Sequence, residues 1–238
     1  MDEENIIFDL MQDESDPIIS DIRYFVSTHN NYYVYSWILR EIYQIGKDGT
    51  KHGQSTKEGR GPGEHSMLSS LAMNSKWIFT ADEENARVNI YNHDFDYQKT
   101  VPEILAKDIA VSENLLLTTR FNYEGLTDNG LVKIAFLNTP EKAVKFIMPK
   151  IVPDGYQPFI YNSVDIAINN YNQIAASYSP LPWIFLFDEN QELENALLFE
   201  DSRFDSLDRV PLDIHKPDPN NQDGIGGANL LSKICVNG

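Results

Sequence analysis

The stretch that decides the fold is Gly59-Arg60-Gly61-Pro62-Gly63-Glu64, followed closely by Trp77-Ile78-Phe79-Thr80-Ala81-Asp82-Glu83-Glu84-Asn85-Ala86-Arg87-Val88-Asn89-Ile90-Tyr91. It begins with a glycine-rich turn and continues as two short segments in which apolar and polar residues alternate. The polar residues Asp82 to Asn85 separate those two segments. Alternation on both sides of a polar corner indicates paired β-strands. We therefore expect an all-β fold.

An alternating segment that ends in a polar turn recurs along the chain. The four turns begin at Ile45, Tyr91, Leu137 and Phe187, with gaps of 46, 46 and 50 residues. Repeats of about 40 to 50 residues, each with several short strands, are typical of the blades of a β-propeller. The sequence therefore predicts blades of four antiparallel strands.

The expected strands fill about four full blades and part of a fifth. They are Asp21 to Val26, Tyr32 to Ser36, Arg40 to Ile45 and a strand near Thr50; Ser70 to Met73, Trp77 to Ala81, Arg87 to Tyr91 and Tyr97 to Val101; Lys107 to Val111, Leu115 to Arg120, Leu131 to Leu137 and Ala143 to Met148; Val164 to Ile168, Gln173 to Tyr178, Trp183 to Phe187 and Ala196 to Phe199; and a fifth beginning at Leu230 to Val236.

The stretch from Gly59 to Tyr91 resembles one NHL-type repeat, in which a glycine-rich turn precedes a strand ending near an Asp and then an Asn-x-Arg segment. Its G-x-G-P-G-E turn is similar to that of exported six-bladed, TolB-like propellers common in Bacteroidetes-like bacteria. The resemblance implies a propeller of the cell envelope or periplasm. It also implies that residues 1–238 are a single propeller domain that lacks one or two C-terminal blades.

Composition restricts the classes of partner. The 238 residues include 19 basic and 36 acidic side chains, for a net charge of −17. Such a charge opposes binding to nucleic acid or to an anionic membrane. No apolar run approaches the roughly 20 residues of a membrane-spanning helix. The oligomeric state is not predictable from these features.

Strands in a blade alternate in direction, so the connections between them open on two opposite faces. The short-turn face holds Asn30-Asn31, Asn74-Ser75, Glu113-Asn114, Asn169 to Asn172 and the polar turns described above. The long-loop face holds His52 to Leu68, Phe121 to Gly130, Pro149 to Ser163, Ser179 to Pro182 and Asp201 to Gly227, with Asp82 to Ala86 as its brief connection. Long loops on a rigid scaffold are where binding groups are usually found.

We therefore expect a binding site on the long-loop face, at the end of the central axis that we call the mouth. Its candidate residues combine aromatic rings, which stack on flat ligands, with charged groups. They are Arg60, Glu64, His65, Arg120, Tyr123, Tyr156, Tyr161, Tyr178 and Trp183.

Two further sets of residues are expected to be structural. Gly59, Gly61 and Gly63 fit a tight turn between blades; their N–H groups could also hold an anion, but a phosphate-binding loop would lead into a helix rather than a strand. Arg87 is expected to pair with Asp82 while Asn85 caps the corner between their strands.

No catalytic motif is present in the sequence. The histidines show none of the spacings of a zinc site, although His52, His65 and His215 all fall on the long-loop face by our strand assignment. Two hypotheses follow. The first is a non-enzymatic scaffold, without cofactor, that binds a protein, peptide or glycan; the alternative is a hydrolase or lyase that uses a metal such as calcium or zinc at the mouth.

Overall fold

The computed structural model describes residues 21–54, 56, 58–119, 130–140, 142–149, 163–178, 181 and 183–198. Within these ranges the chain forms four antiparallel sheets of four strands each. The strands of blade 1 are β1 (Ile22–Ser27), β2 (Asn31–Ser36), β3 (Glu41–Gly46) and β4 (Lys51–Gln54), and those of blade 2 are β5 (Leu68–Met73), β6 (Ile78–Asp82), β7 (Arg87–Tyr91) and β8 (Tyr97–Pro102). Blade 3 contains β9 (Ile109–Val111), β10 (Leu115–Thr119), β11 (Val132–Phe136) and β12 (Ala143–Ile147), and blade 4 contains β13 (Val164–Ile168), β14 (Ile174–Tyr178), β15 (Trp183–Phe187) and β16 (Leu193–Leu198).

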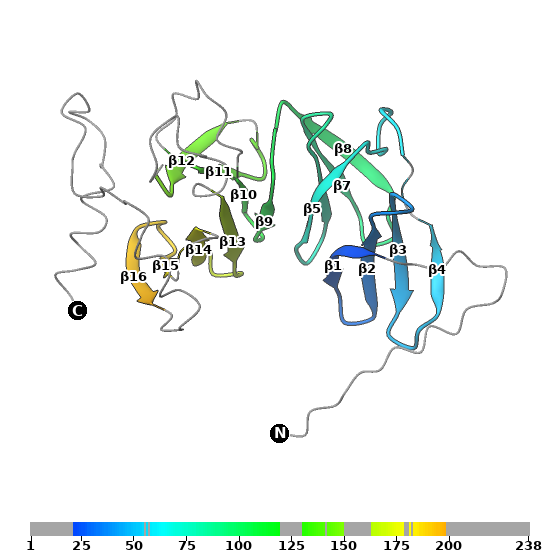
Figure 1. Cartoon of the computed structure of the whole chain (residues 1–238), viewed down its shortest axis with the longest axis horizontal. Coiled ribbons are helices and arrows are strands. Elements are labelled where there is room, and N and C mark those ends of the chain that lie inside the picture. The colour runs from blue at the N-terminus through cyan, green and yellow to red at the C-terminus, as the bar shows by residue number, and fades with distance from the viewer. Residues whose placement is uncertain are drawn as a thin grey trace.

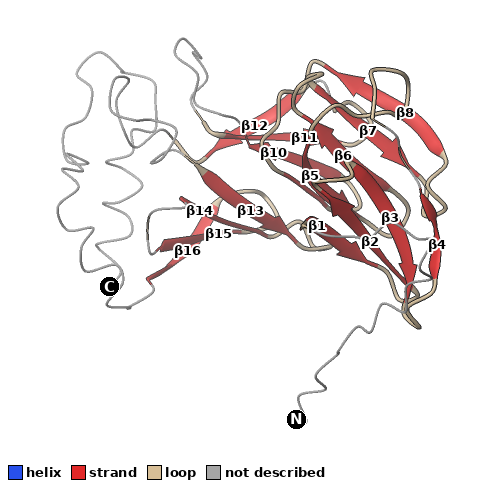
Figure 2. Ribbon diagram, turned by 45° about the vertical axis from the view of Figure 1, so that its right-hand side comes forward, coloured by secondary structure: helices blue, strands red, loops and turns tan. Residues whose placement is uncertain are grey.

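Each sheet is a meander in which consecutive strands are hydrogen-bonded neighbours. The sheets follow one another in chain order, from blade 1 in blue to blade 4 in gold (Figure 1). The first strand of each blade lies beside that of the next, because β1 contacts β5, β5 contacts β9 and β9 contacts β13. Figure 2 shows the same sheets with loops at both ends of the strands. The described residues therefore form a β-propeller arrangement of four blades.

Apolar side chains fill the space between neighbouring blades. Between blades 1 and 2 the cluster includes Tyr35, Ile42 and Ile78, and between blades 2 and 3 it includes Phe79 and Leu116. The third cluster, between blades 3 and 4, consists of fourteen buried residues. Full burial of one such side chain stabilises the fold by roughly 1.5–3 kcal/mol. These clusters hold the sheets face to face.

The observed strands follow the predicted alternation closely, with differences at irregular ladders. Strand β16 begins at Leu193 rather than at Ala196, because it pairs with β15 across a register shift between Leu186 and Phe187. A similar shift lets β5 begin at Leu68. The fifth segment, Leu230 to Val236, lies outside the described residues. The described ranges contain no helix that could cross a membrane.

Polar side chains stabilise the connections of the short-turn face. Oδ1 of Asn92 accepts the N–H groups of Asp94 at 3.0 Å and Asp96 at 2.7 Å. Oδ1 of Asp188 accepts that of Glu192 at 2.8 Å in the equivalent turn of blade 4. An Asx side chain that satisfies its own turn in this way keeps the connection short and rigid.

Candidate functional site

The strand bounds place three of the predicted long connections on one face, whereas Asp201 to Gly227 lies outside the described residues. Residues 55–67 join β4 to β5, residues 120–131 join β10 to β11, and residues 148–163 join β12 to β13. Two further connections on this face, 37–40 and 103–108, are also short, so the expectation that Asp82 to Ala86 is its one brief connection is wrong. The long-loop face therefore combines short connections at blades 1 and 2 with the long loops.

The glycine-rich turn binds its own carboxylate. Oε2 of Glu64 accepts the N–H of Gly61 at 2.7 Å. A Cβ atom at Gly59 would stand 2.1 Å from the same oxygen, and one at Gly61 would stand 2.8 Å from it. Gly63 has a φ of +74°, a left-handed conformation that favours glycine. The N–H of Gly61 is thus engaged by Glu64, and that of Gly59 donates to the carbonyl oxygen of His65 at 3.0 Å, so neither is free to bind a ligand anion.

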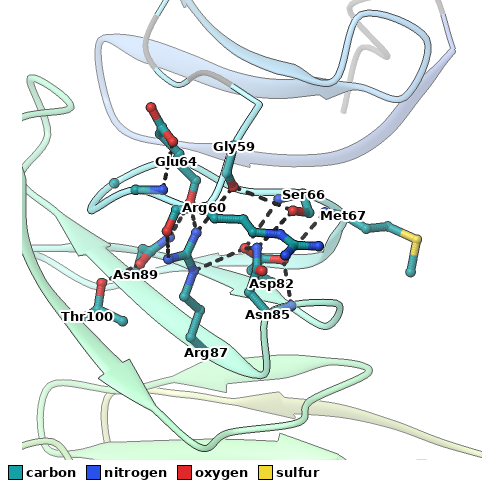
Figure 3. A network of polar contacts seen from close by, with 12 residues as sticks. Gly59, Arg60, Glu64, Ser66, Met67, Asp82, Asn85, Arg87, Asn89 and Thr100 are labelled. Carbon is teal, nitrogen blue, oxygen red and sulfur yellow. Dashed lines mark hydrogen bonds and ion pairs between the residues drawn. The ribbon is translucent and has the colours of Figure 1, made fainter.

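A polar network fastens this turn to the corner between β6 and β7 (Figure 3). Oδ2 of the fully buried Asp82 lies 3.1 Å from Nε of Arg87 and accepts Nδ2 of Asn85 at 2.7 Å. Arg87 also donates to the carbonyl oxygens of Glu64 at 2.6 Å and Arg60 at 2.9 Å. The three residues of the Asp82, Asn85 and Arg87 motif thus hold the inter-blade turn in place.

His65 does not face the mouth; it is fully buried between blades 1 and 2. Its ring packs edge-on against Tyr35, with centroids 5.6 Å apart, and its Nε2 lies 2.9 Å from the carbonyl oxygen of Arg40. A carbonyl only accepts, so Nε2 carries the hydrogen and Nδ1 is unprotonated. Nδ1 has no hydrogen-bond partner among the described residues. Burial lowers the pKa of His65.

This burial predicts a loss of stability in mild acid. Because the pKa of His65 is lowered in the folded chain, the unfolded chain, whose histidine has an ordinary pKa of about 6.5, binds a proton at a higher pH than the folded chain does. The free energy of unfolding therefore has its full value above about pH 6.5 and declines as the pH falls below it. Urea titrations at a series of pH values should show a shallower decline for His65→Phe than for the unsubstituted chain.

The exposed His29 provides the control for this titration. His29→Gln should retain the pH dependence of the unsubstituted chain. An unchanged slope in His65→Phe would show that the buried imidazole is not responsible.

The other predicted binding residues that the structure describes do not form one cluster. Tyr178 ends β14 with only 1% of its surface exposed, and its hydroxyl donates to the carbonyl oxygen of Pro149. It belongs to the core between blades 3 and 4, against which the half-buried Trp183 also packs. Arg60 is exposed. Four candidates, Arg120, Tyr123, Tyr156 and Tyr161, lie outside the described residues, as does His215.

Near the axis, the structure brings together carboxylates that sequence reasoning missed. Oδ1 of Asp108 accepts the hydroxyl of Ser70 at 2.6 Å and the N–H of Ile109 at 2.9 Å. Burial raises the pKa of Asp108, and the neighbouring charge of Asp165 adds to that rise. The backbone of Ile166 also hydrogen-bonds to Asp108. Asp108 therefore links blades 2, 3 and 4, and its oxygens are engaged in that structural role.

A second missed feature is an exposed apolar patch in blade 1. We call it the blade 1 rim and define it as Ile22, Arg23, Trp37 and Ile38. The N–H of Trp37 donates to the carbonyl oxygen of Asp21 at 3.0 Å, which places the 37–40 corner beside the start of β1. Ile38 is 66% exposed and Ile22 is 49% exposed. The guanidinium of Arg23 lies 4.7 Å from the Trp37 ring centroid.

The blade 1 rim has the chemistry of a protein-binding surface. Exposed apolar side chains next to Trp and Arg are typical of the centres of protein interfaces. The sequence signal was the pair Trp37-Ile38 in a tight turn, where polar residues are the rule. Among the described residues, no group of three or more His, Cys, Asp or Glu side chains gathers as a metal site would require.

Comparison with solved structures places the chain among β-propellers. A Bacteroides fragilis protein described as exported aligns with a TM-score of 0.63 at 17% identity, over 76% of this chain and 51% of that one. A member of the DUF4221 family from Bacteroides vulgatus aligns with a TM-score of 0.55 at 11% identity, over 75% and 57%. Catalytically inactive virginiamycin B lyase from Staphylococcus aureus, solved with quinupristin, gives 0.50 and 11%, over 76% and 56%.

These similarities establish the fold alone, because every identity is far below 25%. The chain spans about half the length of the solved propellers that it matches. No protein-family model and no curated protein sequence matches it. The NHL-type and six-bladed character that the sequence suggested therefore stays a prediction.

Proposed function

We propose that this chain is a non-enzymatic binding module that recognises a protein or peptide through its long-loop face. The observation that carries the proposal is the blade 1 rim, where two exposed isoleucines flank an Arg23–Trp37 pair. Two hydrogen bonds hold the 37–40 corner in place. Ser36 Oγ accepts the N–H of Leu39, and the carbonyl oxygen of Arg40 accepts the Nε2 hydrogen of the buried His65. A rigid apolar surface loses little conformational entropy when it binds.

Charge supports a peptide ligand over a nucleic acid. The net charge of −17 repels polyanions, whereas an apolar peptide with basic flanks would be attracted to the acidic surface. The binding proposal requires no cofactor. A glycan is the second ligand class that we predicted, and Trp37 is a described aromatic ring on this face that could stack on a sugar.

The test compares two single substitutions at exposed positions on opposite faces. Random peptides displayed on phage are selected against the unsubstituted chain, and a glycan array is probed in parallel. Ile38→Asp places a charge in the blade 1 rim, and Tyr171→Asp places one on the short-turn face at a residue that is 79% exposed. Both variants should fold, because both side chains project into solvent.

We expect selected peptides to lose at least about tenfold in affinity for Ile38→Asp, the effect of losing one central apolar contact. Tyr171→Asp should bind them as the unsubstituted chain does. Peptides that bind both variants equally, or that discriminate only against Tyr171→Asp, would refute the proposed face. Enrichment on the glycan array alone would refute the peptide class.

The metal-assisted alternative has no described residue that favours it. His65 is engaged at Nε2 within the blade interface, and Asp108 is engaged between blades. Elemental analysis of the purified chain, followed by thermal unfolding with Ca²⁺, Zn²⁺, Mn²⁺ or EDTA, tests it directly. The binding proposal predicts no stoichiometric metal and no shift in melting temperature that EDTA reverses.

A further inference from the structure

The first strands of blades 2, 3 and 4 share a pattern of four residues. It consists of a polar residue, a large apolar residue, a small residue and a second large apolar residue. The three examples are Ser70-Leu71-Ala72-Met73, Asp108-Ile109-Ala110-Val111 and Asp165-Ile166-Ala167-Ile168. The pattern has period two, so its large and small members point to opposite sides of the sheet.

Each member of the pattern has a fixed role between blades. The large residues pack toward the preceding blade, as Ile109 and Val111 do against blade 2. The small residue packs toward the following blade, since Ala72 belongs to the cluster between blades 2 and 3 and Ala110 to the cluster between blades 3 and 4. The pattern therefore specifies neighbours on both sides.

The polar residue accepts a hydrogen bond from the next blade. Ser70 Oγ accepts the N–H of Ile109 at 3.2 Å, and Asp108 is hydrogen-bonded by the backbone of Ile166. In both cases the donor is the first large residue of the following blade's pattern. Asp165 occupies the equivalent position in blade 4.

The side of blade 4 that faces away from blade 3 carries the same kinds of residue as the sides of blades 2 and 3 that pack against the following blade. Asp165, Ser177, Ile184 and Leu197 lie in register across its four strands. Leu197 is 45% exposed, and Ala167 is exposed as well. Ile184 and Leu186 are only partly buried. By contrast, the equivalent third-strand residues of blades 2 and 3 are at most 4% exposed; they are Val88, Ile90, Val132 and Ile134. We call this surface the outer face of blade 4.

The chain carries a fourth copy of the pattern beyond blade 4. Lys233-Ile234-Cys235-Val236 again places a polar residue before a large, a small and a large residue. The copy lies in residues 199–238, outside the described ranges, and blade 4 leads directly into that segment. Lys133-Ile134-Ala135-Phe136 of the third strand β11 has the same order, but within residues 199–238, which follow blade 4, Lys233 to Val236 is the copy in which the small residue is Ala-like in size.

We propose that residues 233–236 form the first strand of a fifth blade and dock on the outer face of blade 4. Ile234 and Val236 pack toward Asp165 and Ala167, while Cys235 points away. The N–H of Ile234 donates to the carboxylate of Asp165. The occupant of this face is thus a segment of the same chain, which continues the series of interfaces between blades.

A cysteine pair tests the docking in the full chain. Cys235→Ser removes the native thiol, and Ala167→Cys with Val236→Cys places two thiols where we expect the strands to meet. Mild oxidation or a short bifunctional thiol reagent should give an intrachain cross-link, identified by peptide mapping. In the control, Asp94→Cys replaces Ala167→Cys; Asp94 lies on a blade 2 turn, and this pair should stay unlinked.

Two results of this experiment would overturn the proposal. Cross-linked dimers in place of the intrachain product would show that a second copy covers the face. Two reactive thiols without any cross-link would show that residues 233–236 are elsewhere.

Hydrogen exchange provides a measurement that needs no cysteine variant. The amide of Ile234 should exchange slowly in the unsubstituted chain, and Asp165→Ala should speed its exchange about tenfold, as expected for one lost hydrogen bond to a charged acceptor. Asp94→Ala, which removes a carboxylate from the short-turn face, should leave the rate unchanged. Fast exchange of Ile234 in the unsubstituted chain would refute the docked strand, even if the cysteine variants failed to fold.

Discussion

Asp82→Ala is expected to reduce the free energy of unfolding by about 3–5 kcal/mol, the usual cost of removing one partner of a buried ion pair. Asp82 is fully buried and its Arg87 partner is 11% exposed, so water cannot replace the lost carboxylate. The change also leaves the N–H of Ser66 without its acceptor and removes one of the two acceptors of Asn85 Nδ2, which keeps the Ser66 hydroxyl. Urea denaturation followed by intrinsic fluorescence measures the effect.

The exposed pair of Asp21 and Arg23 provides the matched control for Asp82. These side chains are 38% and 50% exposed, with Oδ1 and Nε 3.3 Å apart. Asp21→Ala should cost less than about 1 kcal/mol, as exposed ion pairs usually do. If both variants lost the same small amount, the Asp82 network would not hold the glycine-rich turn in place.

Tyr178→Ala is expected to have a similarly large effect, about 3–5 kcal/mol, because it empties a fully buried aromatic site in the core between blades 3 and 4. Tyr178→Phe keeps the ring and removes the hydroxyl that donates to the Pro149 carbonyl oxygen. It should cost about 1–3 kcal/mol, the penalty for leaving a buried acceptor unsatisfied. Thermal and urea unfolding of both variants measure the difference.

A ligand-binding role for Tyr178 makes the opposite prediction. In that case both substitutions would leave stability unchanged and would weaken binding of the selected peptides. Such an outcome would contradict the burial described here and restore Tyr178 to the predicted binding site.

The blades could be predicted from the sequence because their signal is local. Alternation marks the strands, and the polar turns predicted to begin at Ile45, Tyr91, Leu137 and Phe187 coincide within one residue with the ends of β3, β7, β11 and β15. The Asp82, Asn85 and Arg87 pairing was also predictable, because all three residues lie within one hairpin. Strand ends such as Leu193 were less accurate because register shifts are not visible in a single strand.

The binding site was less predictable because it depends on contacts between blades. Tyr178 was assigned to the mouth although it shares the period-two face of Ile174 and Ala176, a signal that would have placed it in the core. His65 lies in a loop, where no periodicity reports burial. Asp108 acquires its role only from Ser70 and Ile166, which belong to other blades.

The most direct test of the central claim is a hydrogen-exchange footprint of the chain with and without a selected peptide. Our account predicts added protection in residues 21–24 and 36–41, which contain the blade 1 rim, and unchanged exchange in the short-turn segments 28–30, 92–96 and 188–192. Protection confined to those short turns would contradict it and would place the binding surface on the opposite face of the propeller.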